Sequence, residues 1–345
     1  MAAVGDVVRE AFRIEEHGID WRSALVGAVV AIGPLAVGLA IDEVPAGLTA
    51  TIGGLNTALC VPRAGARARW WWGTLAAVGS GASLALADLV GAHSWSLVPA
   101  TFVWVGAWGF VRAAGPNGAL VGFATCAVFT TFAGIPLGDE GLDQLLMWHA
   151  FGAIPALVFM VAVRRGPEPP ARLARHVLQV VREAALHDSA LREHVVRLGG
   201  AVAAGTLLYR AIDLSHGYWV ALTTLAILQP GEHATELRAV QRAAGTLVGA
   251  ALILVIMLVT EDRWALVACA GASAFWLYAL DERGYFWLVV MLTPTAADAE
   301  RARLRGEAIV AERVANSALG IVIGLLIGEA AWRLSRGASA KPSTG

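Results

Sequence analysis

Long apolar stretches without charged residues recur along this chain from Ser23 to Trp332. Many have about the length of ~20 residues that an α-helix needs to cross a ~30 Å hydrocarbon core. A soluble fold cannot hide so much apolar surface, because its exterior must also be largely polar. A bilayer accepts such stretches as helices, since each helix satisfies its own backbone polar groups. The pattern therefore predicts an all-α, polytopic membrane protein.

The composition supports this class and excludes others. Of 345 residues, 57% are hydrophobic and only 15% are charged, whereas soluble domains carry roughly 25% charged residues. The formal net charge of −1, without a basic block, argues against nucleic-acid binding. Three scattered cysteines form neither a CxxC pair nor a disulfide framework. Without HExxH, GxSxG or phosphate-binding motifs, we expect no enzyme, no metal, no cofactor and no ATP-driven transport within this chain.

The apolar runs predict about twelve spans in two six-helix halves. The first six are roughly 23–41, 45–61, 70–87, 95–111, 118–137 and 144–163, and the second six are roughly 195–209, 214–229, 243–260, 264–280, 284–295 and 314–332. The predicted organisation is an N-terminal cytoplasmic amphipathic segment (1–22), a first transmembrane half (23–163), a cytoplasmic amphipathic linker (164–194), a second transmembrane half (195–332) and a polar C-terminal tail (333–345).

Arginine placement predicts the orientation, because cytoplasmic loops are enriched in positive charge. Arg63, Arg67 and Arg69 follow the second span, whereas Asp42 and Glu43 follow the first. Both termini are then cytoplasmic, and the arginine, alanine and glycine bias suggests the inner membrane of a bacterium with a GC-rich genome. The arginines of the 296–313 loop conflict with this rule, because they would face outward.

Two copies of one pattern occur in the second half. Each begins with adjacent aromatic residues and has a proline about ten residues later. An arginine follows, with Ser or Thr four residues after it and Gly seven residues after it. The copies read Tyr218-Trp219, Gln229-Pro230, Arg242, Thr246, Gly249 and Tyr285-Phe286-Trp287, Thr293-Pro294, Arg313, Ser317, Gly320. An odd number of helices separates them, so we expect inverted three-helix repeats with a substrate site between them. Chance recurrence of residues that are common in membrane helices is the alternative.

Arg242 is the strongest candidate for an anion contact. It lies one turn before Gly245, Thr246 and Gly249, whose small side chains let another helix approach closely. Its guanidinium fork suits a carboxylate. The alternative is ordinary anchoring at the cytoplasmic surface, with lipid phosphate as the partner.

Other polar and helix-breaking residues are candidates for the same path. Pro230, after Gln229, and Pro294 are expected to interrupt their spans and so mark a cavity, unless each simply ends a helix at the interface. Trp219 either belongs to an interfacial aromatic belt or stacks on a substrate. His149 and Asn316 lie inside spans, where a proton relay and a single helix–helix hydrogen bond are both open.

From Tyr218-Trp219 through Gln229-Pro230 to the run Arg242-Ala243-Ala244-Gly245-Thr246-Leu247-Val248-Gly249, the chain resembles the FUSC family of integral membrane bound transporters, the fusaric acid resistance and aromatic acid exporter group. Arg313, Ser317 and Gly320 are similar to that family's second arginine box. The resemblance covers roughly 210–330, and the first half matches only in helix pattern. Members often carry a long cytoplasmic domain between the halves, of which only the linker is present here.

The resemblance implies proton-coupled export of small organic anions such as aromatic carboxylic acids, with the lipid bilayer as the surrounding partner. The arginines beside helix breaks agree with an anionic substrate without identifying it. An anion channel of related architecture and a membrane scaffold without transport activity are the alternatives, and a homo-oligomer is left open.

Overall fold

The structure, a computed structural model, describes residues 10–12, 18–91, 94–135, 141–168, 173–280, 284–301 and 308–339. Within these ranges the chain is helical and forms no strand, which confirms the all-α prediction. Most of the predicted N-terminal segment, Arg303 and Arg305 of the loop that conflicts with the charge rule, and the chain beyond Ser339 lie outside the described residues.

Six α-helices of the first half coincide with the six predicted apolar runs. They are α2 (Trp21–Ala40), α3 (Val44–Cys60), α4 (Ala66–Val90), α5 (Leu97–Gly109), α6 (Pro116–Phe132) and α7 (Leu142–Val163). Helix α5 continues into the 3₁₀-helix η1 (Phe110–Ala114). The second half follows the linker helix α8 (Leu173–His187). It comprises α9 (Ser189–Ala211), α10 (Tyr218–Ile227), α11 (Glu232–Val259), α12 (Arg263–Ala279), α13 (Tyr285–Arg301) and α14 (Ala308–Ser339).

Among the described helices, six are long and apolar enough to cross a membrane. These are Trp21–Ala40, Ala66–Val90, Leu97–Ala114, Leu142–Val163, Glu232–Val259 and Ala311–Ala330. The prediction of twelve full spans is therefore not confirmed. The largest difference is α10, which has 10 residues and so a length of only ~15 Å at about 1.5 Å per residue.

Helix α13 corrects a second prediction. Pro294 was expected to break this helix, but α13 continues without interruption from Tyr285 to Arg301. Thr293 donates its hydroxyl proton to the Val289 carbonyl at 2.8 Å. Neighbouring helices and such back-bonding hydroxyls allow proline inside membrane helices, which explains why Pro294 is accommodated without a break.

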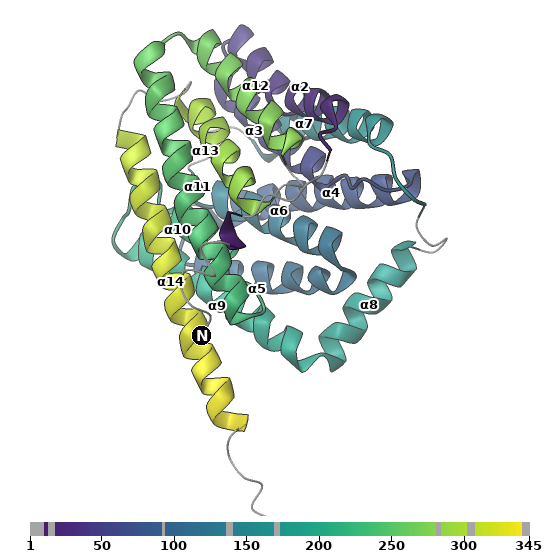
Figure 1. The fold of residues 1–345 in the computed structure, drawn as a ribbon, viewed down its shortest axis with the longest axis vertical. Coiled ribbons are helices and arrows are strands. Elements are labelled where there is room, and N and C mark those ends of the chain that lie inside the picture. The colour runs from purple at the N-terminus through teal and green to yellow at the C-terminus, as the bar shows by residue number, and fades with distance from the viewer. Residues whose placement is uncertain are drawn as a thin grey trace, which may run out of the picture.

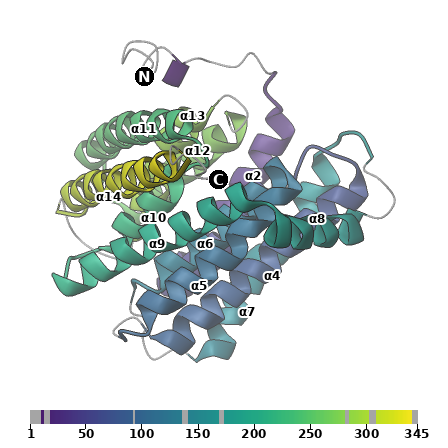
Figure 2. The same ribbon diagram turned by 90° about the horizontal axis from the view of Figure 1, so that it is seen from below.

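The helices form two groups that cross steeply. In Figure 1, α4, α5 and α6 run across the view, whereas α11 and α14 run down it. Figure 2 shows α11, α13 and α14 gathered on one side and α4, α5 and α7 on the other. Helices α9 and α10 lie between these groups, since α9 packs against α5 and α10 packs against both α6 and α14.

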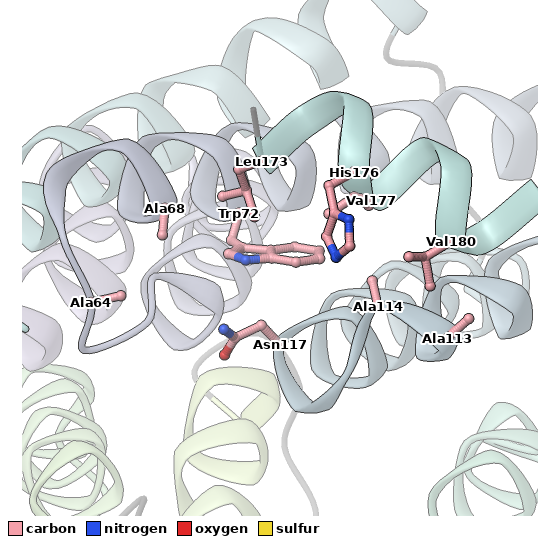
Figure 3. Close-up of a pocket in the computed structure, with 10 residues that line it drawn as sticks. All are labelled: Ala64, Ala68, Trp72, Ala113, Ala114, Asn117, Leu173, His176, Val177 and Val180. Carbon is pink, nitrogen blue, oxygen red and sulfur yellow. The ribbon is translucent and has the colours of Figure 1, made fainter. Parts of the chain in front are cut away.

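The linker helix α8 is amphipathic, as predicted. Val177 is buried, with Leu173 and Val181 packed beside it against α4 and η1, whereas Leu178 on the other face is 64% exposed. Figure 3 shows α8 lying over this part of the first half. Asp188 then caps α9 by accepting a hydrogen bond from the Leu191 amide at 2.9 Å, as expected at a helix N-terminus.

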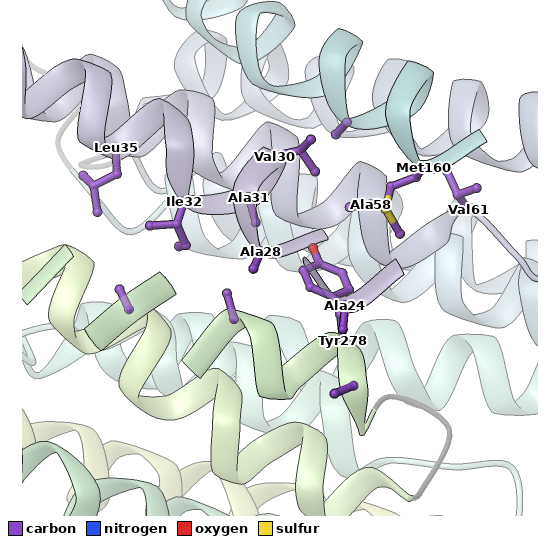
Figure 4. Packing of buried hydrophobic residues seen from close by; sticks show 14 of the residues in the cluster. Ala24, Ala28, Val30, Ala31, Ile32, Leu35, Ala58, Val61, Met160 and Tyr278 are labelled. Carbon is purple, nitrogen blue, oxygen red and sulfur yellow. The ribbon is translucent and has the colours of Figure 1, made fainter. Parts of the chain in front are cut away.

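The main hydrophobic core joins α2, α3 and α7 with α12. Figure 4 shows Tyr278 of α12 beside Ala24 and Ala28 of α2. The Tyr278 ring lies against Gly27, where an added Cβ would be 2.6 Å from the ring, and its hydroxyl donates to the Leu55 carbonyl at 3.1 Å. A second-half helix thus completes a core built by the first half.

A second core joins α5 and α6 of the first half with α9 and α10 of the second. Val105 and Cys126 from the first half pack there with Val202 and Leu222 from the second. Both of these cores therefore contain helices from the two predicted halves. The division of the chain at the linker stays a prediction about sequence organisation.

Candidate functional site around helix α10

Helix α10 is enclosed by protein along its whole length. All of its 10 residues, from Tyr218 to Ile227, are buried, and α6, α9, α11 and α14 pack around it. The helix ends at Ile227, and Leu228 takes an extended conformation before Gln229 and Pro230. The helix thus ends ahead of Pro230, and the idea that this break marks a cavity stays a prediction. The carbonyl groups at the end of the helix consequently need partners from the protein.

Arg313 of α14 stacks on α10. Its guanidinium carbon lies 3.8 Å from the centroid of the Trp219 ring, and the two residues are only 3% and 6% exposed. Trp219 thus points into the protein. A guanidinium over an indole face is a cation–π contact, which is strongest when water is excluded.

Arg242 of α11 reaches α10 one helical turn further on. Its Nη2 donates to the Thr223 hydroxyl at 3.3 Å, and the residue is 4% exposed. Among the described residues, no carboxylate lies within ion-pair distance of Arg242, and its buried Nε finds no acceptor. This burial does not fit the alternative of lipid-phosphate anchoring.

Helix α14 also holds the turn before α10. Asn316 donates from Nδ2 to the carbonyls of Ser215 and His216, at 2.9 and 3.1 Å. His216 has a positive φ of 50°, and its Nδ1 lies 2.6 Å from a carboxylate oxygen of Glu312. Asn316 therefore joins α14 by hydrogen bonds to the turn that leads into α10.

Two arginines from other helices meet the carbonyl end of α10. Arg197 of α9 donates from Nη2 to the carbonyls of Gln229 and Pro230, at 3.3 and 3.0 Å. Arg112 of η1 donates to the Gln229 side-chain oxygen at 3.1 Å. These acceptors belong to Gln229 and Pro230, beyond the C-cap Leu228, and positive charge near a helix C-terminus opposes the negative end of the helix dipole.

Sequence reasoning missed the roles of Arg112 and Arg197. Arg112 directly follows the predicted span 95–111, and Arg197 lies near the start of the predicted span 195–209. Their partner Gln229 lies 117 and 32 residues away in sequence, so no local pattern connects them. The one available signal is that each stands at the edge of an apolar run, where an arginine can reach inward.

The glycines of the two motif copies pack reciprocally. A Cβ added to Gly245 or Gly249 of α11 would lie 2.8 Å from Val289 or 2.5 Å from Thr293, both on α13. A Cβ added to Gly320 of α14 would lie 2.5 Å from the Val220 carbonyl oxygen on α10. Each arginine-bearing helix thus packs its glycines on the aromatic-led helix of the other copy. The inverted orientation of the copies stays a prediction.

The remaining predicted residues have different surroundings. Thr246 is buried within α11. His149 lies in α7, away from α10, with its Nε2 at 3.1 Å from both the Ser80 hydroxyl and the Ala77 carbonyl of α4. That geometry is a helix–helix hydrogen bond in the first half. The backbone of Pro294 continues α13, and its side chain is outside the described residues.

The site is predominantly basic. Arg112, Arg197, Arg242 and Arg313 approach α10 or the two residues after it from four different elements. Among the described carboxylates, Glu193 lies 3.7 Å from Arg197 on the solvent-exposed side. No group of residues suited to a metal ion occurs in the described part of the chain. The arrangement gathers four guanidinium groups around α10 and the residues that follow it.

Comparison with known proteins identifies the same region. Residues 202–327 match the family model described as "Fusaric acid resistance protein-like". This range contains Trp219, Arg242 and Arg313, on which the sequence resemblance depended, so that resemblance is confirmed. No solved structure gives a significant match to this chain.

Three relatives share segments with the chain. The Neisseria gonorrhoeae "Uncharacterized protein ORF2" is 39% identical over 75 residues, the Escherichia coli K12 "Inner membrane protein YccS" is 37% identical over 81 residues, and the "Uncharacterized protein YhfK" of the same strain is 28% identical over 139 residues. These segments cover 22%, 24% and 40% of this chain, but only 18%, 10% and 20% of the relatives. With its apolar helices, the likeness to an inner membrane protein supports a multi-pass inner membrane location.

Proposed function

We propose, on the premise that residues 202–327 belong to the fusaric acid resistance protein-like family, that this chain is a membrane transporter. Its proposed substrates are small organic anions such as aromatic carboxylic acids, exported across a bacterial inner membrane with both termini in the cytoplasm and driven by protons. The path is proposed to run along α10, between α11 and α14.

One observation carries this proposal: Arg242 and Arg313 approach α10 one turn apart, at Thr223 and Trp219, from opposite motif copies. Removing a guanidinium from water is costly unless an anion or several acceptors compensate for it. Among the described residues, Arg242 has a single neutral acceptor, the Thr223 hydroxyl, and a buried Nε without one. A carboxylate bound beside it supplies the missing acceptors in bidentate geometry.

The shape of α10 supports a path rather than a purely structural cluster. A helix of 10 residues enclosed by protein, followed by extended backbone at Leu228, is the kind of discontinuous element on which transporters build substrate sites. Irregular backbone at membrane depth is tolerated where it is buried in protein or lines a cavity.

The experiment uses the purified protein in liposomes that enclose benzoate, salicylate or acetate. Release is followed with and without an imposed pH gradient for the wild type, Arg242→Ala and Arg242→Lys. Arg333→Ala is the matched control, because Arg333 lies on the exposed end of α14, paired with Glu329. We expect gradient-dependent release of the aromatic acids, lost in Arg242→Ala, reduced in Arg242→Lys and unchanged in Arg333→Ala.

Other outcomes separate the alternatives. Release that follows membrane voltage and ignores the pH gradient would indicate an anion channel. Release that is the same in Arg242→Ala and in the wild type would remove Arg242 from the path. No release of any of the three acids would leave the scaffold as the remaining interpretation for these substrates.

A further inference from the structure

A cavity lies beneath the linker helix α8, away from α10. Its volume is about 320 Å³, and α4, η1, α6 and α8 all contribute to its wall. Figure 3 shows the Trp72 ring and the His176 imidazole close together, with Asn117 below them. Ligand pockets in proteins begin at roughly 300 Å³, so this cavity has room for a molecule built on a single ring.

The lining is that of a site for an aromatic ring. Trp72 is buried and presents its indole, while Ala68, Ala114 and Val177 supply small apolar walls. Polar atoms come from His176 and Asn117. An apolar pocket with a few polar groups at one edge orients a ring that carries one polar substituent, and a ring offset over an indole gains additional stacking energy.

The charge around the cavity favours an acidic substituent. Arg69 lies three residues before Trp72 on α4, a spacing at which side chains share one side of a helix. Its Nε and Nη1 are buried and have no acceptor among the described residues. Arg175 precedes His176 on the exposed side of α8. Neither arginine lines the cavity, but both adjoin residues that do, so a carboxylate at the edge of the ring meets the side chains of His176 and Asn117 with two cationic groups nearby.

The cavity shares an element with the site around α10. Ala113 and Ala114 of η1 line it, and Arg112 of the same 3₁₀-helix donates to the side chain of Gln229 at 3.1 Å. A ligand that presses on η1 from beneath α8 thus acts on the residue that holds the end of α10.

We propose that the cavity beneath α8 binds a single-ring aromatic carboxylate at a site separate from α10, and that the bound acid changes the Arg112–Gln229 contact through η1. Binding itself does not depend on the proposed transport function. If that function also holds, this is a site at which the same class of acid regulates its own passage.

Binding is tested on the full chain in detergent micelles by ¹⁹F NMR, with 4-fluorobenzoate as the probe and 4-fluorobenzamide as its neutral counterpart. Val180→Trp fills the cavity from α8, since Val180 lines it. Leu178→Trp adds the same bulk to the exposed face of that helix. We expect Val180→Trp to weaken benzoate binding by at least about tenfold, with Leu178→Trp close to the wild type and benzamide binding more weakly.

Each departure from this pattern overturns a specific part. Equal affinity in Val180→Trp and the wild type would place the probe elsewhere. Equal binding of the amide would remove the carboxylate from the proposal. A thermal melt of each variant, compared with Leu178→Trp, excludes loss of folding as the cause.

The coupling to α10 is read by hydrogen–deuterium exchange in peptides that cover residues 228–235. We expect 4-fluorobenzoate to change exchange there in the wild type and not in Val180→Trp. Unchanged exchange in the wild type at saturating probe would overturn the coupling. None of these measurements requires transport, so failure of the proposed function would leave their result intact.

Discussion

The guanidinium of Arg313 lies over the ring of Trp219, with 3.8 Å between its central carbon and the ring centroid. The contact joins the arginine of one motif copy to the aromatic residue of the other, because Arg313 is on α14 and Trp219 on α10. Both residues are buried, and a desolvated cation–π contact is worth about 2 kcal/mol. This pairing therefore contributes to the position of the short helix.

A double-mutant cycle tests that contribution. Trp219→Leu and Arg313→Gln are each expected to lower the thermal unfolding midpoint, and together they should show a coupling of about 1–2 kcal/mol, because both changes remove the same contact. The measurement is thermal or denaturant unfolding of the purified variants. Trp264→Leu serves as the control, since Trp264 is half exposed. Strictly additive effects would show that the contact contributes nothing.

Gly320 is expected to be intolerant of a methyl group. A Cβ there would stand 2.5 Å from the Val220 carbonyl oxygen and 2.8 Å from Thr223, so α14 would have to move away from α10. Such overpacking typically costs about 1–3 kcal/mol. We expect Gly320→Ala to lower the melting midpoint and to reduce flux in the liposome assay.

Gly271 of α12 provides the matched control. A Cβ added there would meet no atom within 4 Å, so Gly271→Ala should be neutral or stabilise the helix by about 0.5–1 kcal/mol. If both glycine variants melted alike, the close approach of α14 to α10 would be refuted.

Thr235 organises the bend between α10 and α11. It is fully buried, and its hydroxyl accepts from the Gln229 amide at 2.9 Å and lies 3.0 Å from the Gly231 carbonyl. Thr235→Val keeps the shape but leaves that partly buried amide without its acceptor, at a cost of about 1 kcal/mol. Denaturant unfolding should detect this loss, whereas Thr235→Ser should restore most of the stability. Failure of serine to do so would assign the effect to packing.

Local patterns in the sequence were sufficient for much of the fold. Apolar runs predicted the helices, since burial in lipid or protein depends on the composition of each segment. The spacing of Arg242 and Arg313 from their glycines predicted that both arginine-bearing helices pack closely on neighbours, and the glycine environments agree with this. The proline at 230 predicted the break after α10 because proline cannot donate a backbone hydrogen bond.

Contacts between distant segments were beyond such patterns. Nothing near Arg112 in the sequence points to Gln229, and the length of α10 depends on where α6, α9 and α14 enclose it. Pro294 failed as a break because neighbouring groups in a packed membrane helix compensate for the lost hydrogen bond. His149 looked like a relay candidate because its partners on α4 are about 70 residues away.

Asp20 connects the stability of α2 to pH. It caps this helix, accepting from the Ser23 amide at 3.1 Å and from the Ser23 hydroxyl at 2.5 Å. Burial opposes its ionisation, but these hydrogen bonds and the charge of Arg63 outweigh burial and hold the pKa of Asp20 below its ordinary value. A depressed pKa means that the stabilisation is present above the unfolded value of ~3.9 and is lost as the pH falls through the folded one.

Asp20→Ala should therefore cost about 1 kcal/mol at pH 7, and its deficit relative to the wild type should shrink as the pH falls below ~3.9. Asp20→Asn is the matched control, because asparagine keeps a capping oxygen but does not titrate. The measurement is the thermal midpoint of the three proteins in one detergent between pH 7 and pH 3. A deficit in Asp20→Ala that stayed constant over this range would mean that the carboxylate charge contributes nothing to the cap.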